Sequence, residues 1–242
     1  MTITARPGVS VRTSWERLDS FLSVLGSEDA EILRADIAAL LNDARPADGR
    51  MARSHQTRRA IVDAMRALHS EGDLRPTAPR VAARAGVSLR TVWQHFADME
   101  TLLLEAGRRD LEILLQIVSP IPADLPLAER ISMLADQRTR VHERMTPGWR
   151  AARIQSPFSP ELRRSKKRMT ALARAELEAV FAVEFAKLPA TERKALIDAM
   201  EGVTIWAFWE SLRTDVGLTP REARDTVEGL VEALFMQAGL AT

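Results

Sequence analysis

The chain has 242 residues, enough for one large domain or two modest ones, and its 46% hydrophobic and 28% charged residues are ordinary for a globular protein. It has no cysteine, which excludes disulfide bonds, thiolate metal ligands and a cysteine nucleophile. No apolar run approaches the length of a membrane-spanning helix, and residues 1–15 lack the apolar core of a signal peptide. We therefore expect a cytoplasmic protein that does not interact with a membrane.

The net charge of +1 hides an uneven distribution of charged residues. Residues 1–49 carry a net charge of −3, residues 50–96 of +6 and residues 97–242 of −2. Positive charge gathered in one segment is typical of DNA binding. Because the chain uses arginine throughout, with 30 arginines against 4 lysines, the gathering can also arise by chance.

Helical periodicity dominates the chain, and no alternating strand pattern is visible. Residues 13–25 and 27–41 predict two helices, and residues 44–54 predict a linker because Pro46 and Gly49 interrupt the pattern. Two such helices are too small to bury a core alone, so they must pack on the rest of the chain or on a partner. We assign residues 1–52 to an N-terminal helical extension and linker.

The next segment predicts a helix-turn-helix between two further helices, over residues 57–69, 77–86, 88–96 and 98–118. In this motif two helices cross closely through a short turn. Ala82 supplies the small residue that the crossing needs, and Gly86 supplies a turn residue that accepts a positive φ. Thr77, Ser88 and Asp98 are suitable N-caps for the second, third and fourth helices.

With Val92 and Phe96 turned inward, a polar and bulky set remains on the outside of the third helix: Ser88, Leu89, Arg90, Thr91, Trp93 and Gln94. The second helix of a helix-turn-helix enters the major groove, where Arg90 can pair with guanine and Gln94 with adenine. Thr77 and Ser88, at helix N-termini, suit a phosphate, and Trp93 and His95 can donate to the DNA backbone. The alternative is a structural corner in which Trp93 is a core residue.

From Thr57 to about Leu104, the chain resembles the DNA-binding domain of the TetR/AcrR family of transcriptional regulators. The stretch that carries the motif is TAPRVAARAGVSLRTVWQHFADMETLL, residues 77–103. In that family a Thr-capped helix ends in Ala-Gly-Val-Ser, and a Tyr-x-His-Phe sequence and an acidic helix start follow. The resemblance implies that one set of residues contacts DNA phosphates and that a second set lies near the bases. The phosphate set is Thr77, Thr91, Trp93 and His95, and the base set is Ser88, Leu89, Arg90 and Gln94.

Three features depart from the family pattern. Trp93 stands where the family usually has tyrosine, which keeps a donor but changes its reach. Met99 stands where a lysine usually grips a phosphate, so one charged contact is expected to be missing. The N-terminal extension is also longer than the usual arm of the family.

Residues 108–242 resemble the helical effector-binding and dimerisation domain of the family more weakly, and residues 53–107 are assigned to the DNA-binding domain. The sequence predicts a break at residues 119–126, followed by helices over residues 127–145, 148–155, 160–187, 191–214 and 220–238. Residues 195–212 are apolar around much of the helix, as is expected when a helix is buried on more than one side. Two such helices can form a four-helix interface between copies, or they can be core helices of a monomer.

The bulky and adaptable residues of the middle helices are candidates for an effector pocket: Met133, His142, Met145, Trp149, Phe158, Met169 and Trp206. Methionine and aromatic side chains suit an apolar or aromatic small molecule. Arg138, His142 and Arg153 can add a polar anchor for an anion. The alternative is that these residues fill the core.

The fold class expected is therefore all-α, with a helix-turn-helix domain, a helical effector-binding and dimerisation domain, and the N-terminal extension. We expect a homodimeric repressor that binds double-stranded DNA at an inverted repeat and is released by a small effector. An enzyme is disfavoured, because the four histidines lack metal-ligand spacing and neither a phosphate-binding glycine loop nor a nucleophile elbow occurs. No cofactor or metal is expected. The alternative is an adaptor of the same fold that acts through protein partners and binds DNA weakly or without sequence preference.

Overall fold

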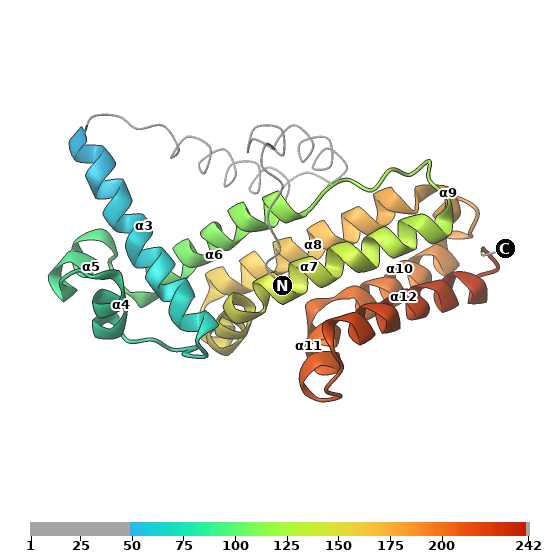
Figure 1. The fold of residues 1–242 in the computed structure, drawn as a ribbon. Helices are drawn as coiled ribbons and strands as arrows, with labels where there is room; N and C mark the ends of the chain where they lie inside the picture. The colour runs from blue at the N-terminus through green and yellow to red at the C-terminus, as the bar shows by residue number, and fades with distance from the viewer. Residues whose placement is uncertain (1–48, 241–242) are drawn as a thin grey trace. The chain divides into compact units, whose positions relative to one another are not determined.

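The computed structural model describes residues 49–240, and every regular element in that range is helical (Figure 1). The predicted all-α class is confirmed, whereas most of the proposed N-terminal extension, residues 1–48, lies outside the described residues. The elements are α3 (Gly49–Ser70), α4 (Ala78–Ala85), α5 (Leu89–His95), α6 (Met99–Ile117), α7 (Leu127–Gln155), η1 (Ser156–Phe158), α8 (Pro160–Val180), α9 (Ala182–Phe185), α10 (Ala190–Thr204), α11 (Trp206–Thr214) and α12 (Pro220–Gln237). Among these helices, none combines the length and the hydropathy needed to cross a membrane.

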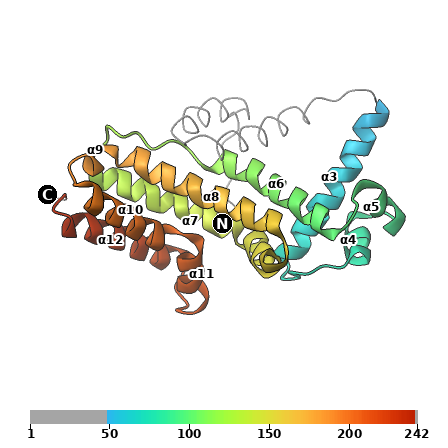
Figure 2. The same ribbon diagram turned by 180° about the vertical axis from the view of Figure 1, so that it is seen from behind.

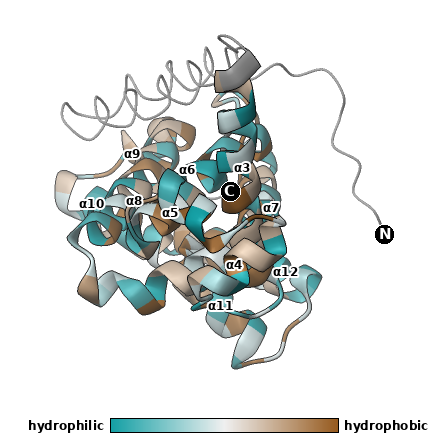
Figure 3. Ribbon diagram, turned by 90° about the vertical axis from the view of Figure 1, so that its left-hand side faces the viewer, coloured by the Kyte–Doolittle hydropathy of each residue, from teal (hydrophilic) through white to brown (hydrophobic). Residues whose placement is uncertain are grey.

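The described residues form two compact units. Residues 49–114 and 145–167 make up the amino-terminal unit, and residues 115–144 and 168–240 make up the carboxy-terminal unit. The helices α6, α7 and α8 each contribute to both. In Figure 3 the ribbon changes between hydrophobic and hydrophilic residues along single helices, as expected for helices with one buried and one exposed side.

The core of the amino-terminal unit gathers around one face of α3. Ile61, Met65 and Leu68 of this helix are almost completely buried, and they pack with Val81 and Ala82 of α4 and with residues of α5, α6 and α8. The small Ala82 lets the two helices of the turn motif approach closely, as the sequence predicts. This core holds α4 and α5 on α3.

The carboxy-terminal unit is a set of packed helices in which α10 runs beside α12 (Figures 1 and 2). A buried ion pair joins α7 to α9, because Arg130 Nη2 and Nη1 donate to the two carboxylate oxygens of Glu184 at 2.6 and 2.8 Å. The same guanidinium donates to the carbonyl groups of Leu125 and Val180. Such a buried pair is tolerable because its polar atoms are satisfied.

Two predicted helix boundaries are wrong near proline and glycine. The first is the predicted start of a helix at Thr57, because α3 begins at Gly49. The strong helix formers that follow Gly49 extend the helix through the predicted linker. The second is the predicted break at Pro147, because α7 is one helix from Leu127 to Gln155 with this proline inside it. A proline removes one backbone donor and can bend a helix without ending it.

The predicted single helix over residues 191–214 is interrupted at Ile205, which is extended with φ −73° and ψ 150°. The β-branched run Val203-Thr204-Ile205 has a low helix propensity. The break leaves the Thr204 carbonyl group without a helical partner, and it lies 3.0 Å from Nε2 of His142. The apolar surface predicted for residues 195–212 is therefore divided between α10 and α11.

Candidate nucleic-acid interface

The turn between α4 and α5 depends on the left-handed conformation of Gly86. Its φ is +68° and its ψ is 30°, a region that residues with a side chain seldom adopt. The next backbone N–H, that of Val87, donates to the Ala82 carbonyl at 3.0 Å. The chain thereby reverses within two residues and places Ser88 at the start of α5.

The start of α5 is fixed by two hydroxyl groups. Ser88 Oγ accepts a hydrogen bond from the Thr91 backbone N–H at 3.0 Å and lies 2.8 Å from Thr91 Oγ1. Val92 and Phe96 are turned inward, with exposed fractions of 0% and 2%. The inward pair sets the rotation of α5, so the opposite residues of the helix must face outward.

The outward face of α5 carries the residues expected near the bases. Leu89 and Trp93 have exposed fractions of 41% and 43%, and Arg90 and Gln94 are exposed as well. Within residues 49–240 no ion pair engages Arg90. This face therefore combines two large apolar side chains with a cation and an amide that stay available to a partner.

Three of the residues expected at phosphates surround this face. Thr77 is the exposed N-cap of α4 and its side chain makes no capping hydrogen bond. Thr91 and His95 of α5 are half-buried. Seven of the eight predicted DNA-contacting residues thus lie on α5 or its cap, and Thr77 begins the preceding helix.

Arg58 of α3 is a positioning residue that the sequence interpretation missed. Its Nη1 donates to the His95 carbonyl at 2.7 Å, and its guanidinium carbon lies 4.3 Å from the centre of the Phe96 ring. Its Nη2 also pairs with Glu105 of α6 at 3.2 Å. One side chain of α3 therefore fixes the end of α5, and only its place in a basic helix hinted at such a role.

Part of the positive charge of this segment is neutralised within it. Arg80 Nη1 pairs with Asp73 at 3.2 Å and Arg84 Nη2 pairs with Glu71 at 2.6 Å. The net charge of +6 for residues 50–96 already subtracts Asp73 and Glu71, so these two pairs decide which arginines are free to meet DNA and leave the total unchanged. These exposed pairs are weak, so a phosphate can compete for either arginine.

The candidate effector residues divide between the two units. Met145, Trp149 and Phe158 belong to the amino-terminal unit, and the other four, Met133, His142, Met169 and Trp206, belong to the carboxy-terminal unit. Met145 and His142 are buried, whereas Met133 and Phe158 are exposed by 39% and 80%. A pocket common to all seven stays a prediction.

His142 is held in a buried polar cluster rather than left open as an anchor. Its Nε2 lies 3.0 Å from the Thr204 carbonyl, and its ring centre lies 5.7 Å from that of Trp209. Burial, assisted by the nearby Arg138 charge, lowers the pKa of His142 to about 3. The imidazole is therefore neutral at neutral pH.

The second proposed anchor, Arg138, is engaged by Glu176. Its Nη2 lies 2.6 Å from the Glu176 carboxylate, which also accepts from the Gln137 side chain. The Gln137 Oε1 in turn accepts from the Ser119 N–H at 2.8 Å. An anion at Arg138 would have to compete with this buried carboxylate. In the range of residues 49–240, no three His, Asp or Glu side chains gather in a way that suits a metal ion.

Comparison with known proteins identifies the segment around the turn. Residues 61–106 match the family model described as bacterial regulatory proteins, tetR family. A crystal structure of a candidate TetR-family transcriptional regulator from Mesorhizobium loti MAFF303099 shares 19% sequence identity, with a TM-score of 0.52, over 76% of this chain and 98% of that chain. At this identity the likeness shows a common fold. No curated protein matches the chain.

Proposed function

The chain belongs to the tetR family of bacterial regulatory proteins through residues 61–106, and from this premise we propose that it represses transcription from an inverted-repeat operator. The observation that carries the proposal is the outward face of α5, where Arg90 and Gln94 are exposed beside Leu89 and Trp93. Large apolar side chains exposed in a group are typical of surfaces that a partner covers. The DNA-binding domain is assigned to residues 53–107.

In the proposed complex α5 enters the major groove. Arg90 pairs with guanine and Gln94 with adenine, and Leu89 and Ser88 lie near bases. The backbone phosphates are met by Thr77, Thr91, Trp93 and His95. The indole N–H of Trp93 is a donor and not an acceptor, which suits a phosphate oxygen.

The protein acts as a homodimer in this proposal, because an inverted repeat presents two half-sites related by a two-fold axis. The carboxy-terminal helices are proposed to form the dimer, and exposed apolar side chains such as Met236 of α12 support this. Residues 108–242 are assigned to effector binding and dimerisation. A small apolar or aromatic molecule, bound among the candidate effector residues named above, changes the spacing of the two α5 helices and releases the operator.

The test is selection of bound fragments from the genome of the source organism, followed by footprinting at two salt concentrations. We expect protection of an inverted repeat. Arg90→Ala should weaken specific binding by about 1–3 kcal/mol and relax the preference at one base pair, and adding Trp93→Ala should weaken it further. Arg221→Ala is the matched control, because this arginine of α12 is 91% exposed and lies in the other unit.

Sequence-blind binding that disappears with salt would contradict the proposal and favour the adaptor alternative. The repressor assignment is tested separately by transcription from the footprinted promoter. A ligand that stabilises the protein without altering its DNA affinity would contradict release by an effector.

A further inference from the structure

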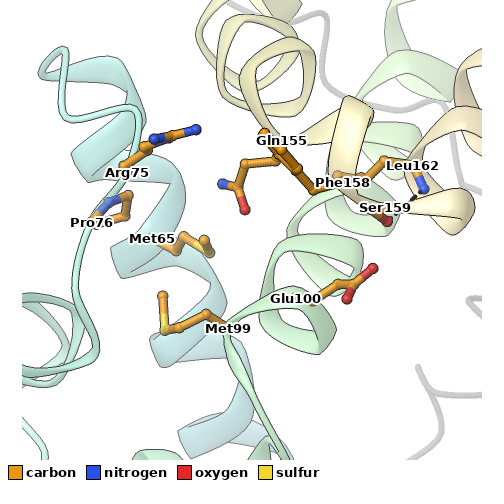
Figure 4. Close-up of a pocket in the computed structure, with 9 residues that line it drawn as sticks. All are labelled: Met65, Arg75, Pro76, Met99, Glu100, Gln155, Phe158, Ser159 and Leu162. Atoms are coloured by element: carbon orange, nitrogen blue, oxygen red, sulfur yellow. Dashed lines mark hydrogen bonds between the residues drawn. The ribbon is translucent and has the colours of Figure 1, made fainter.

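A hollow of about 290 Å³ lies inside the amino-terminal unit (Figure 4). It is bordered by α3, by the loop from α3 to α4, by the start of α6, and by the segment from the end of α7 to the start of α8. All of its lining residues belong to this one unit. Its volume is at the lower end of the range for small-molecule sites, which suits one ring or a short chain.

The lining of the hollow includes an apolar set. Met65 and Leu162 are buried, with exposed fractions of 1% and 8%, and Met99 is partly buried against the same core. Methionine side chains adapt to apolar and aromatic surfaces. Met99 is also the residue that stands where the resemblance expects a lysine, so its thioether takes up an apolar role at this position.

One cation borders the hollow without a carboxylate partner among residues 49–240. The guanidinium of Arg75 is exposed, and the nearby Asp73 carboxylate pairs instead with Arg80. Figure 4 shows the Arg75 side chain directed across the hollow toward the Gln155 amide, with Met65 and Met99 beside it. The Glu100 carboxylate, which also borders the hollow, points away from Arg75 in this view.

Phe158 adds an uncovered aromatic ring to the lining. Its exposed fraction is 80%, so a ligand that covers the ring removes a large apolar surface from water. The turn that presents it is well bonded, because Arg163 Nη1 donates to the Ser156 and Pro157 carbonyls at 3.0 and 2.9 Å. The ring is thus displayed by an ordered turn.

We propose that this hollow binds a small organic monocarboxylate with an apolar or aromatic body. The carboxylate pairs with Arg75, the body lies on Met65 and Met99, and Phe158 covers it. Glu100 repels a second negative charge, which restricts the ligand to one carboxylate at the Arg75 end. The site goes beyond the proposed effector pocket, with which it shares only Phe158, and its occupancy does not depend on DNA binding.

The test uses the full chain labelled with methyl-¹³C methionine and titrated with 3-phenylpropionate, without DNA. Each of the nine methionine signals is assigned by a single Met→Leu substitution. We expect saturable shifts of the Met65 and Met99 signals, while those of Met133 and Met200 in the carboxy-terminal unit stay unchanged. The uncharged 3-phenylpropionamide and the cationic 3-phenylpropylamine should bind at least ~10-fold more weakly, because neither offers Arg75 a carboxylate.

Two variants of exposed residues test the contacts without threatening the core. Arg75→Gln and Phe158→Ala should each weaken 3-phenylpropionate at least ~10-fold. Arg84→Gln, which changes an arginine outside the hollow, should bind as the parent chain does. Thermal melting of each variant verifies folding.

Any one of four results would contradict the proposal that this hollow binds a monocarboxylate. They are the absence of saturable binding, shifts at Met133 or Met169 with Met65 and Met99 unmoved, equal binding of the amide, and unchanged affinity in both variants. Shifts at Met133 or Met169 would place the carboxylate in the effector pocket proposed above. Loss of DNA binding in a footprinting experiment would leave these outcomes unaffected, so the two proposals fail separately.

Discussion

Replacing Gly148 by alanine should destabilise the protein, although alanine is the better helix former. Gly148 lies in α7 opposite Asp110 of α6, and an added Cβ would come closer to Asp110 Oδ2 than a non-bonded contact allows. Asp110 cannot move aside freely, because its Oδ1 accepts from Arg66 Nε at 2.8 Å. The two side chains of this pair are 16% and 17% exposed.

The two opposing effects can be compared in magnitude. An alanine in place of glycine in a helix interior gains about 1 kcal/mol. Overpacking costs about 1–3 kcal/mol, and displacing Asp110 also weakens a largely buried ion pair, by a further ~1 kcal/mol. We expect a net loss of about 1–3 kcal/mol in the free energy of unfolding.

Urea unfolding of a double-mutant cycle tests this reasoning. In the Asp110→Ala background the obstacle is gone, so Gly148→Ala should become stabilising by about 0.5–1 kcal/mol. Gly107→Ala in α6 is the matched control, because a Cβ there meets nothing within 4 Å, and it should stabilise the parent chain. Equal effects of Gly148→Ala with and without Asp110 would refute the argument.

Three further predictions concern the DNA-binding unit and the buried histidine. Met99→Lys should tighten operator binding at low salt and steepen the salt dependence by about one phosphate contact, measured by titration at several salt concentrations; unchanged or weaker affinity would contradict it. Gly86→Ala should lower the free energy of unfolding by about 1 kcal/mol, because its φ is +68°, and Gly86→Asn should cost less; equal costs in denaturant titrations would argue against backbone strain. Because the pKa of His142 falls from 6.5 to about 3 on folding, the folded state binds fewer protons, and stability decreases as the pH falls below 6.5. Between about pH 7 and pH 5 the parent chain should lose about 2 kcal/mol more than His142→Gln, and parallel losses in urea unfolding would exclude this cause.

The bounds of α4, α5 and α6 could be predicted from the sequence because their signals are local. Thr77, Ser88 and Asp98 each precede a helix, and Gly86 ends one. A cap and a glycine turn act within about four residues, so no distant part of the chain is needed to recognise them. The inward direction of Val92 followed from the same short pattern.

The features that sequence analysis missed depend on partners far along the chain. The break at Ile205 places the Thr204 carbonyl beside His142, 62 residues earlier, and no pattern in residues 191–214 indicates that contact. The contact of Arg58 with the His95 carbonyl likewise joins two helices through tertiary packing. The family pattern predicts only a missing charge at Met99, whereas the folded chain packs this side chain against the core of the amino-terminal unit.

The attachment of α5 through Arg58 bears on the entropy of recognition. A helix of seven residues is too short to persist in water alone, so α5 depends on the contacts that hold its end. Arg58 and Phe96 supply them before any DNA is present. The ordering of this helix is therefore completed during folding of the chain, and its entropic cost is not subtracted again from the free energy of binding.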